Sequence, residues 1–158
     1  LRDIWGTDAT NIYIVGDEGL CHYNGNSWSP LPIAHSKHLT SIVGISADNV
    51  VAVGLDGKTL VYDGNSWMAS FVKEGVAFRK IRILEDATMV IVGDEGTVLV
   101  RDNEEWNSLP SVTGQNLFAL HGQSPASLHV AGNAGVVYRW DGSEWHNEAN
   151  LPLSVDIL

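Results

Sequence analysis

The sequence is poor in cysteine, in positive charge and in long apolar runs, and each shortage excludes a class of protein. The lone cysteine, Cys21, cannot form a disulfide within the chain, and paired-cysteine metal motifs are absent. Nine basic residues stand against 19 acidic ones, which gives a net charge of −10 and no basic stripe for phosphate backbones. No apolar run approaches the roughly 18 residues of a membrane-spanning helix. The sequence therefore predicts no nucleic-acid partner and no membrane insertion.

Helical periodicity is missing too, and four copies of one pattern fill the chain instead. Each copy has an apolar strand that ends in glycine and, further on, a polar turn that leads to tryptophan. Both series of residues step by 38 or 39 positions: Gly16, Gly54, Gly93 and Gly132, then Trp28, Trp67, Trp106 and Trp145. A period of about 40 residues with several short strands per repeat is typical of β-propeller blades.

Each repeat predicts four short strands, which we call A to D in chain order. Strand A has an aliphatic fourth position, and strand B is almost continuously apolar, as expected for a strand buried on both faces. Two glycines bracket the B–C turn, where we expect both to supply positive φ. Asn-Gly or Asp-Gly at the C–D turn indicates a tight hairpin. The predicted fold is all-β, a propeller of four four-stranded antiparallel blades at residues 1–38, 39–77, 78–116 and 117–153.

The last five residues of the sequence repeat the pattern of its start. Ser154–Leu158 matches the opening of strand A in the first repeat, and a closed ring of four blades has no place for it. We therefore expect a piece of a propeller with five to eight blades, and no signal peptide at its start. Two chains that complete one eight-bladed ring, or a four-bladed ring with the tail as a clasp, are the alternatives.

The repeat resembles a known group of bacterial propellers. Val15-Gly16, Val53-Gly54 and Val92-Gly93, followed by turns such as Asp63-Gly64-Asn65-Ser66-Trp67, are similar to the BNR or Asp-box repeats of propellers like the photosystem II stability and assembly factor. The Asp and Gly are adjacent here, so the turn is one residue shorter than an Asp box. The resemblance implies a purely structural role for the turn residues Asp63, Asp102 and Asp141. It also slightly favours an extracytoplasmic or secreted location.

The fifth position of strand A carries the candidate ligand-binding residues. It changes from blade to blade as Trp5, Val43, Arg82 and His121, whereas the fourth position stays aliphatic. If strand A is innermost, these side chains lie near the mouth of the channel, where Trp5 could stack and Arg82 and His121 could bind anions or hydroxyls. The alternative is that a wide channel tolerates any residue there.

The sequence contains no complete set of metal ligands or catalytic residues that we recognise. Acidic pairs at the B–C turns could form a ring, but Asn133-Ala134 breaks it, and the loop residues His35 and His38 lack a third ligand nearby. A sialidase-like enzyme needs three arginines on a carboxylate, and only Arg2 and Arg79 occupy equivalent positions. We therefore predict no metal, no cofactor and no enzyme activity.

The sequence thus favours a scaffold that binds a protein partner through one face of a ring. A lectin-like propeller is the first alternative, with the repeated tryptophans as exposed platforms for sugars. A fragment of a sialidase-like glycoside hydrolase is the second. Packing between blades explains four equivalent tryptophans better than sugar binding does.

Overall fold

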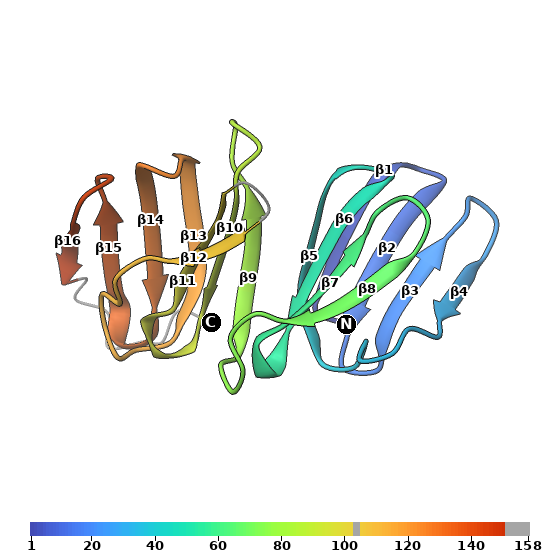
Figure 1. The fold of residues 1–158 in the computed structure, drawn as a ribbon, viewed down its shortest axis with the longest axis horizontal. Helices are drawn as coiled ribbons and strands as arrows, with labels where there is room; N and C mark the ends of the chain where they lie inside the picture. The colour runs from blue at the N-terminus through green and yellow to red at the C-terminus, as the bar shows by residue number, and fades with distance from the viewer. Residues whose placement is uncertain (103–104, 151–158) are drawn as a thin grey trace. The chain divides into compact units, whose positions relative to one another are not determined.

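The computed structural model describes residues 1–102 and 105–150, and it consists of four antiparallel sheets of four strands each (Figure 1). Consecutive strands pair within every sheet, so each sheet is a simple meander. The chain divides into two compact units, Leu1–Phe78 and Arg79–Leu158, which are described separately below. The predicted fifth repeat at 154–158 lies outside the described residues. The blade boundaries therefore stay a prediction.

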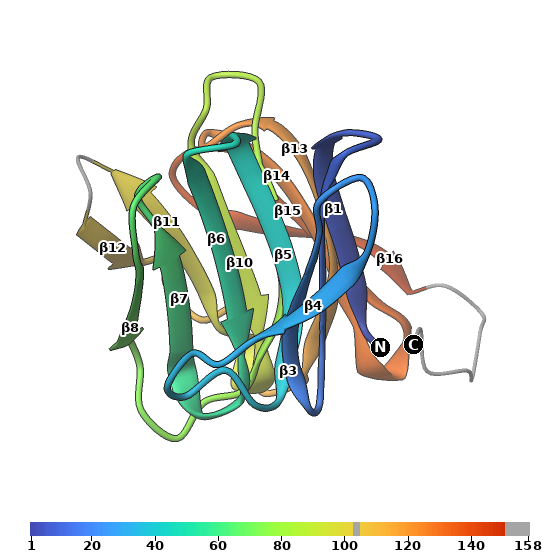
Figure 2. The same cartoon turned by 90° about the vertical axis from the view of Figure 1, so that its right-hand side faces the viewer.

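The first unit contains sheets 1 and 2. Sheet 1 runs in the order β1 (Asp3–Asp8), β2 (Asn11–Gly16), β3 (Gly19–Tyr23) and β4 (Trp28–Leu31). Sheet 2 runs in the order β5 (Leu39–Ser46), β6 (Asn49–Gly54), β7 (Lys58–Tyr62) and β8 (Trp67–Phe71), and Figure 2 shows these four strands side by side. The strands coincide with the predicted repeats.

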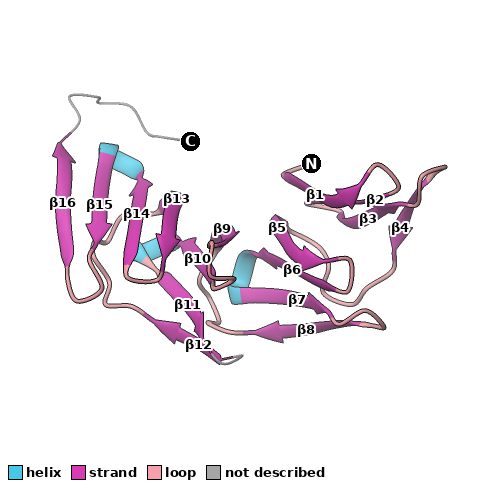
Figure 3. Ribbon diagram, turned by 90° about the horizontal axis from the view of Figure 1, so that it is seen from above, coloured by secondary structure: helices cyan, strands magenta, loops and turns pink. Residues whose placement is uncertain are grey.

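Sheets 3 and 4 make up the second unit, apart from the first residue of sheet 3. Sheet 3 consists of β9 (Phe78–Ile83), β10 (Met89–Gly93), β11 (Val98–Asp102) and β12 (Glu105–Ser108). Sheet 4 consists of β13 (Leu117–Ser124), β14 (Ser127–Gly132), β15 (Val136–Trp140) and β16 (Trp145–Asn150), which Figure 3 shows in that order.

Each unit buries an apolar core between its two sheets. In the first unit the core combines Tyr13, Val15 and Leu20 of sheet 1 with Leu39, Ile42, Val50, Ala52 and Leu60 of sheet 2. In the second unit valines of sheet 3 meet Leu117, Leu120, Leu128, Val130 and Trp140 of sheet 4. One sheet cannot cover its own apolar face, so pairing of neighbouring repeats supplies the burial that stabilises both.

The same row of residues has opposite surroundings in sheets 1 and 2. Ile42, Ala52 and Leu60 lie opposite one another in sheet 2, and Ile42 is 2% exposed. The equivalent row in sheet 1 is Ile4, Ile14 and Cys21, and Ile4 is 62% exposed. The predicted aliphatic fourth position of strand A is therefore a core position only where a sheet covers it.

The C–D turns of sheets 1, 2 and 4 have the predicted hairpin geometry, and a side chain holds each of these three. The Oδ1 atom of Asp63 accepts hydrogen bonds from the backbone N–H groups of Asn65 and Ser66, and the following Gly64 has a φ of 89°. Asn24 and Asp141 make the same pair of bonds in sheets 1 and 4. This Asx turn explains why Asn or Asp precedes Gly in these repeats.

The B–C turns correct one prediction. In sheets 2 to 4 they are short 3₁₀ segments, η1 (Leu55–Gly57), η2 (Asp94–Gly96) and η3 (Asn133–Gly135), shown in cyan in Figure 3. The second glycine of each has positive φ as predicted, but the first is extended, with a φ of −160° at Gly54. Glycine is needed there for space instead, because a Cβ on Gly54 would lie 2.5 Å from the carbonyl oxygen of His38.

No helix within residues 1–102 and 105–150 is long and apolar enough to cross a membrane.

Candidate functional site

Trp5, the first predicted ligand residue, packs against its own unit. Its indole stacks on Tyr13 with ring centroids 6.2 Å apart, and it covers Gly44, where a Cβ would lie 2.3 Å from the indole. Trp5 also borders the core between sheets 1 and 2. The absence of a side chain at position 44 therefore makes room for this ring.

Arg82 and His121 lie on neighbouring A strands of the second unit. The Arg82 guanidinium on β9 donates a hydrogen bond of 3.3 Å to the carbonyl of Leu120 on β13, the residue before His121. Both Arg82 and His121 are exposed. Two positions further along, the Gln123 amide lies 3.5 Å from a Glu85 carboxylate oxygen. We call these four residues, Arg82, Glu85, His121 and Gln123, the polar rim.

The polar rim has a counterpart of opposite charge in the first unit. There Asp3 on β1 accepts hydrogen bonds from the Ser41 hydroxyl (2.6 Å) and the Ile42 N–H (3.1 Å) of β5. Ile42 and Leu120 occupy the same fourth position of strand A. In each unit a side chain of one A strand thus hydrogen-bonds to the backbone of the other A strand at this position. We call this contact the tie; a carboxylate makes it in the first unit and a guanidinium in the second.

Arg82 keeps unused hydrogen-bonding capacity at this tie. A guanidinium has five N–H donors, and one of them reaches Leu120. Within residues 1–102 and 105–150 no carboxylate forms an ion pair with Arg82, whereas Arg2, Arg79 and Arg139 each have one. The polar rim can therefore offer donors to a carboxylate or a hydroxyl.

A row of ionisable residues crosses sheet 4 and begins at His121. His121, His129, Arg139 and His146 lie opposite one another on the four strands β13 to β16. The carboxylate of Glu148 accepts a 2.6 Å bond from Arg139 and lies 3.3 Å from His129. The hydrogen bond from Arg139 is the main reason why the pKa of Glu148 is lowered.

The equivalent row is apolar in sheet 2 and partly aromatic in sheet 1. Sheet 2 has Val43, Val51, Val61 and Met68, and sheet 1 has Trp5, Tyr13, His22 and Ser29. Of the row in sheet 4, the sequence pattern predicts only His121 as a site residue. Aligning the repeats at strands B and C sets His129 beside Tyr13 and Val51, and Arg139 beside His22 and Val61.

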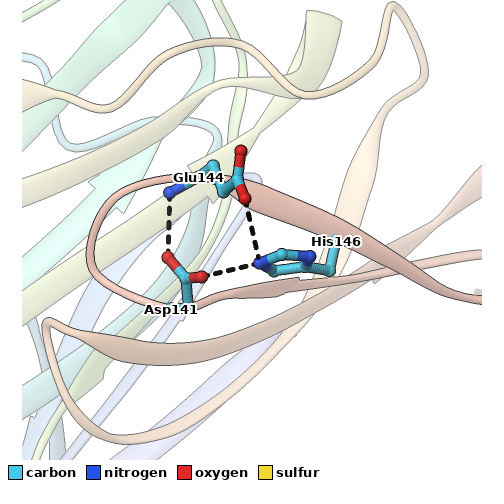
Figure 4. Close-up of side chains that lie close together, drawn as sticks. All are labelled: Asp141, Glu144 and His146. Atoms are coloured by element: carbon cyan, nitrogen blue, oxygen red, sulfur yellow. Dashed lines mark hydrogen bonds and ion pairs between the residues drawn. The ribbon is translucent and has the colours of Figure 1, made fainter.

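The end of the row holds a cluster of Asp141, Glu144 and His146 (Figure 4). Asp141 accepts bonds from the N–H groups of Ser143 and Glu144, and its other oxygen lies 2.6 Å from His146 Nε2. The bond from Glu144, followed by the one with His146, lowers the pKa of Asp141 well below its usual range. These three residues have the donor types to hold a divalent cation, but the Asx turn accounts for the position of Asp141 without one.

The equivalent arginines Arg2 and Arg79 have structural partners. Arg79 donates to both carboxylate oxygens of Asp94 at 2.6 and 2.8 Å, and Arg2 donates to Asp17 at 3.2 Å. Each pair joins strand A to the B–C turn of the same sheet. The hydrogen bond with Asp94 raises the pKa of Arg79 above its ordinary value. Arg79 thus uses two donors on its carboxylate partner, whereas Arg2 makes a single bond and its side chain is 53% exposed.

Two of the repeated tryptophans pack between neighbouring sheets. Trp67 of sheet 2 meets Tyr13 of sheet 1 edge to face at 5.8 Å, and the indole N–H of Trp145 donates to the Pro110 carbonyl at 2.8 Å. The predicted pairing across the hairpin also holds, since Trp67 stacks on Tyr62 at 5.2 Å. Trp28, in sheet 1, is 46% exposed.

Comparisons with known proteins identify the fold. No protein-family model and no curated protein matches the chain. Similar solved structures include YCF48, a photosystem II assembly factor, bound to D1 peptide, at 14% identity and a TM-score of 0.64 over 91% of this chain and 51% of that one. YCF48 from Cyanidioschyzon merolae is 16% identical, with a TM-score of 0.63 over 77% and 42%.

A third similar structure is an enzyme. The GH74 enzyme of Niastella koreensis is 14% identical, with a TM-score of 0.57 over 91% of this chain and 23% of that one. The chain therefore spans about half of YCF48 or less, and about a quarter of the GH74 enzyme. The fold is a β-propeller that resembles the photosystem II assembly factor type, and the sheets are its blades.

Proposed function

We propose that the chain is part of a non-catalytic β-propeller that binds a protein partner at the polar rim. The observation that carries the proposal is the Arg82 guanidinium, which is exposed and has donors that no described carboxylate uses. His121, on the neighbouring strand, supplies a second group for the same ligand. Bidentate binding of a carboxylate is the geometry that a guanidinium favours.

The ligand that fits this chemistry is a peptide with a single exposed carboxylate. A net charge of −10 repels a strongly acidic partner over long range, so local recognition of one carboxylate is more favourable than binding of an acidic tract. The peptide in the YCF48 structure supports a peptide as the class of ligand.

Two observations favour binding over catalysis and over sugar recognition. Arg79 donates two short hydrogen bonds to Asp94 and Arg2 donates one to Asp17, which disfavours the arginine triad of a sialidase-like enzyme. Trp67 packs against Tyr13, so its ring is not an open platform for a sugar. The similarity to a GH74 enzyme keeps a hydrolase as the alternative, and hydrolysis of a glycan by the purified chain would support it.

The test is a titration followed by nuclear magnetic resonance. The probe is acetyl-Ala-Ala-Ala with a free C-terminal carboxylate, and its C-terminal amide is the matched control. We expect the carboxylate form alone to shift the signals of Arg82 Nε and His121, and R82Q to abolish the shift. The variant R2Q removes an arginine from the other unit and should leave it unchanged. Equal shifts with the amide, or full binding by R82Q, would contradict the proposal.

A further inference from the structure

A lysine occupies a position in sheet 2 that is apolar or uncharged in the other blades. Lys58 begins β7 directly after the second glycine of the B–C turn, where the other sheets have Leu20, Thr97 and Val136. Leu20 is 2% exposed and Thr97 is 3% exposed, and Lys58 is itself only 7% exposed. A charge at a core position costs free energy unless something offsets it, so such a departure from the repeat indicates a functional site.

The buried ammonium of Lys58 has one hydrogen-bond partner among residues 1–102 and 105–150. Lys58 Nζ donates a 2.7 Å hydrogen bond to the carbonyl of Lys37. An ammonium has three N–H donors, and within the described part of the chain no carboxylate lies at ion-pair distance from this one. Lys58 therefore combines burial with an uncompensated positive charge.

The loop that supplies this carbonyl is held in an unusual backbone conformation. His35 and His38 flank Ser36 and Lys37, and both have left-handed φ values, 61° and 58°. His38 is fixed on both sides, because its N–H donates to the Asp17 carbonyl and its own carbonyl accepts from Leu55. Left-handed non-glycine residues persist only where their surroundings impose them, and they are frequent at binding sites.

Lys58 lies at the wall of a cavity of about 750 Å³ within the first unit. Pro30, Leu31, Pro32 and Ile33 form its apolar side, and His35, whose ring lies edge to face with that of Phe71 at 5.5 Å, lies at another side. Glu18 also lines the cavity, and its carboxylate is paired with Lys37 at 4.0 Å. This volume falls in the range of small-molecule sites, which are mostly apolar with a few polar groups that fix orientation.

We propose that this cavity binds a carboxylate carried by an apolar body, with Lys58 as the anchor. The carboxylate would accept hydrogen bonds from the free donors of the ammonium, and the apolar body would cover the surface of Pro30 to Ile33. A free organic acid and the C-terminal residue of a peptide share this chemistry. The site lies in the first unit and uses none of the residues of the polar rim.

The experiment measures binding of sodium hexanoate to the 158-residue chain, with hexanamide as the uncharged probe of the same length. We expect hexanoate to shift the amide signals of Ser36 and Lys37 and the Nζ signal of Lys58 in a saturable manner. Hexanamide should bind at least about tenfold more weakly, because it lacks the charge-assisted hydrogen bonds. A second pair, acetyl-Ala-Leu with a free or amidated C-terminus, separates a peptide source from a free acid. Binding of either free carboxylate supports the site.

The variant K58M provides an independent test. It is expected to fold, because the buried Leu20 shows that an apolar side chain fits the equivalent position in sheet 1. We expect K58M to lose the hexanoate shifts, while the matched variant K80M, in the other unit, retains them. No saturable shift with either carboxylate, equal binding of acid and amide, or unchanged binding by K58M would overturn the proposal. The acid–amide comparison uses the unmodified chain, so it stands even where K58M folds poorly. Since Arg82 and His121 report separately, failure here is distinguishable from failure at the polar rim.

Discussion

The two units join their A strands through side chains of opposite charge. In the first unit the Asp3 carboxylate accepts bonds from Ser41 and from the N–H of Ile42, and in the second the Arg82 guanidinium donates to the carbonyl of Leu120. The carboxylate is engaged with buried groups, since Ser41 is fully buried. The guanidinium uses one donor and stays exposed. A repeated fold can therefore connect two A strands at the same backbone position in both units. In one unit the connecting side chain keeps hydrogen-bond donors that could bind a ligand.

The largest expected effect comes from breaking the tie in the first unit. D3A leaves the Ser41 hydroxyl and the Ile42 N–H without their acceptor, and such buried groups cost about 2 to 3 kcal/mol of unfolding free energy. R82A removes one longer, part-buried hydrogen bond to the Leu120 carbonyl and should cost about 1 kcal/mol or less. Urea unfolding followed by circular dichroism measures both. Equal losses in the two variants would show that the ties are equivalent.

A smaller difference in unfolding free energy is expected between variants of the equivalent arginines Arg2 and Arg79. The Arg79 side chain is 29% exposed and makes two short bonds to Asp94, whereas Arg2 is 53% exposed and makes one longer bond to Asp17. We expect R79Q to lower the unfolding free energy by about 1 kcal/mol and R2Q by less than about 0.5 kcal/mol. The same unfolding curves, repeated in 0.5 M NaCl as roughly three times physiological ionic strength, should leave the R79Q loss largely intact. A larger loss for R2Q than for R79Q would reverse the comparison.

The smallest effect at neutral pH concerns the hairpin turns. Asp141 has a folded-state pKa below its unfolded value, so its stabilisation is complete above pH about 4 and is lost as the pH falls through the folded pKa. Asn24 holds the same turn in sheet 1 without a titratable group. We expect D141N to fold normally at pH 7 and to lose less melting temperature than the unmodified chain between pH 5 and roughly 2.

Thermal melts across that pH range provide the measurement for the turn. The reciprocal variant N24D should gain acid sensitivity in the first unit. Parallel curves of melting temperature against pH for D141N and the unmodified chain would contradict the assigned role of the carboxylate.

Much of the fold was predictable because it rests on local rules that recur every 39 residues or so. Hairpins at Asn24-Gly25 and Asp63-Gly64 follow from turn chemistry, and the buried strands follow from apolar runs. The first glycine of the B–C turn was predicted for the wrong reason. Its need for space depends on the His38 carbonyl of a loop 16 residues earlier, and no local pattern reveals that contact.

The candidate sites were harder to predict because they depend on which residues lie opposite one another. Arg82 and His121 could be found as variable positions in strand A, but the spare donors of Arg82 follow only from the partners that it has. Lys58 looks unremarkable in the sequence, since a lysine after a turn is usually solvated. Its burial depends on the loop that carries Lys37, 21 residues earlier, and no local pattern predicts that contact.

The position of the lone thiol has a practical consequence for labelling chemistry. Cys21 is half-buried in the outward row of sheet 1, opposite Ile14 on one side and Pro30 on the other. Because the chain has no other cysteine, a maleimide fluorophore or spin label would attach at this point alone, without any engineered substitution. The molecule thus carries a single native reporter in the same row as Ile4, with Ile14 between them, and the label's accessibility would register whatever comes to cover that face.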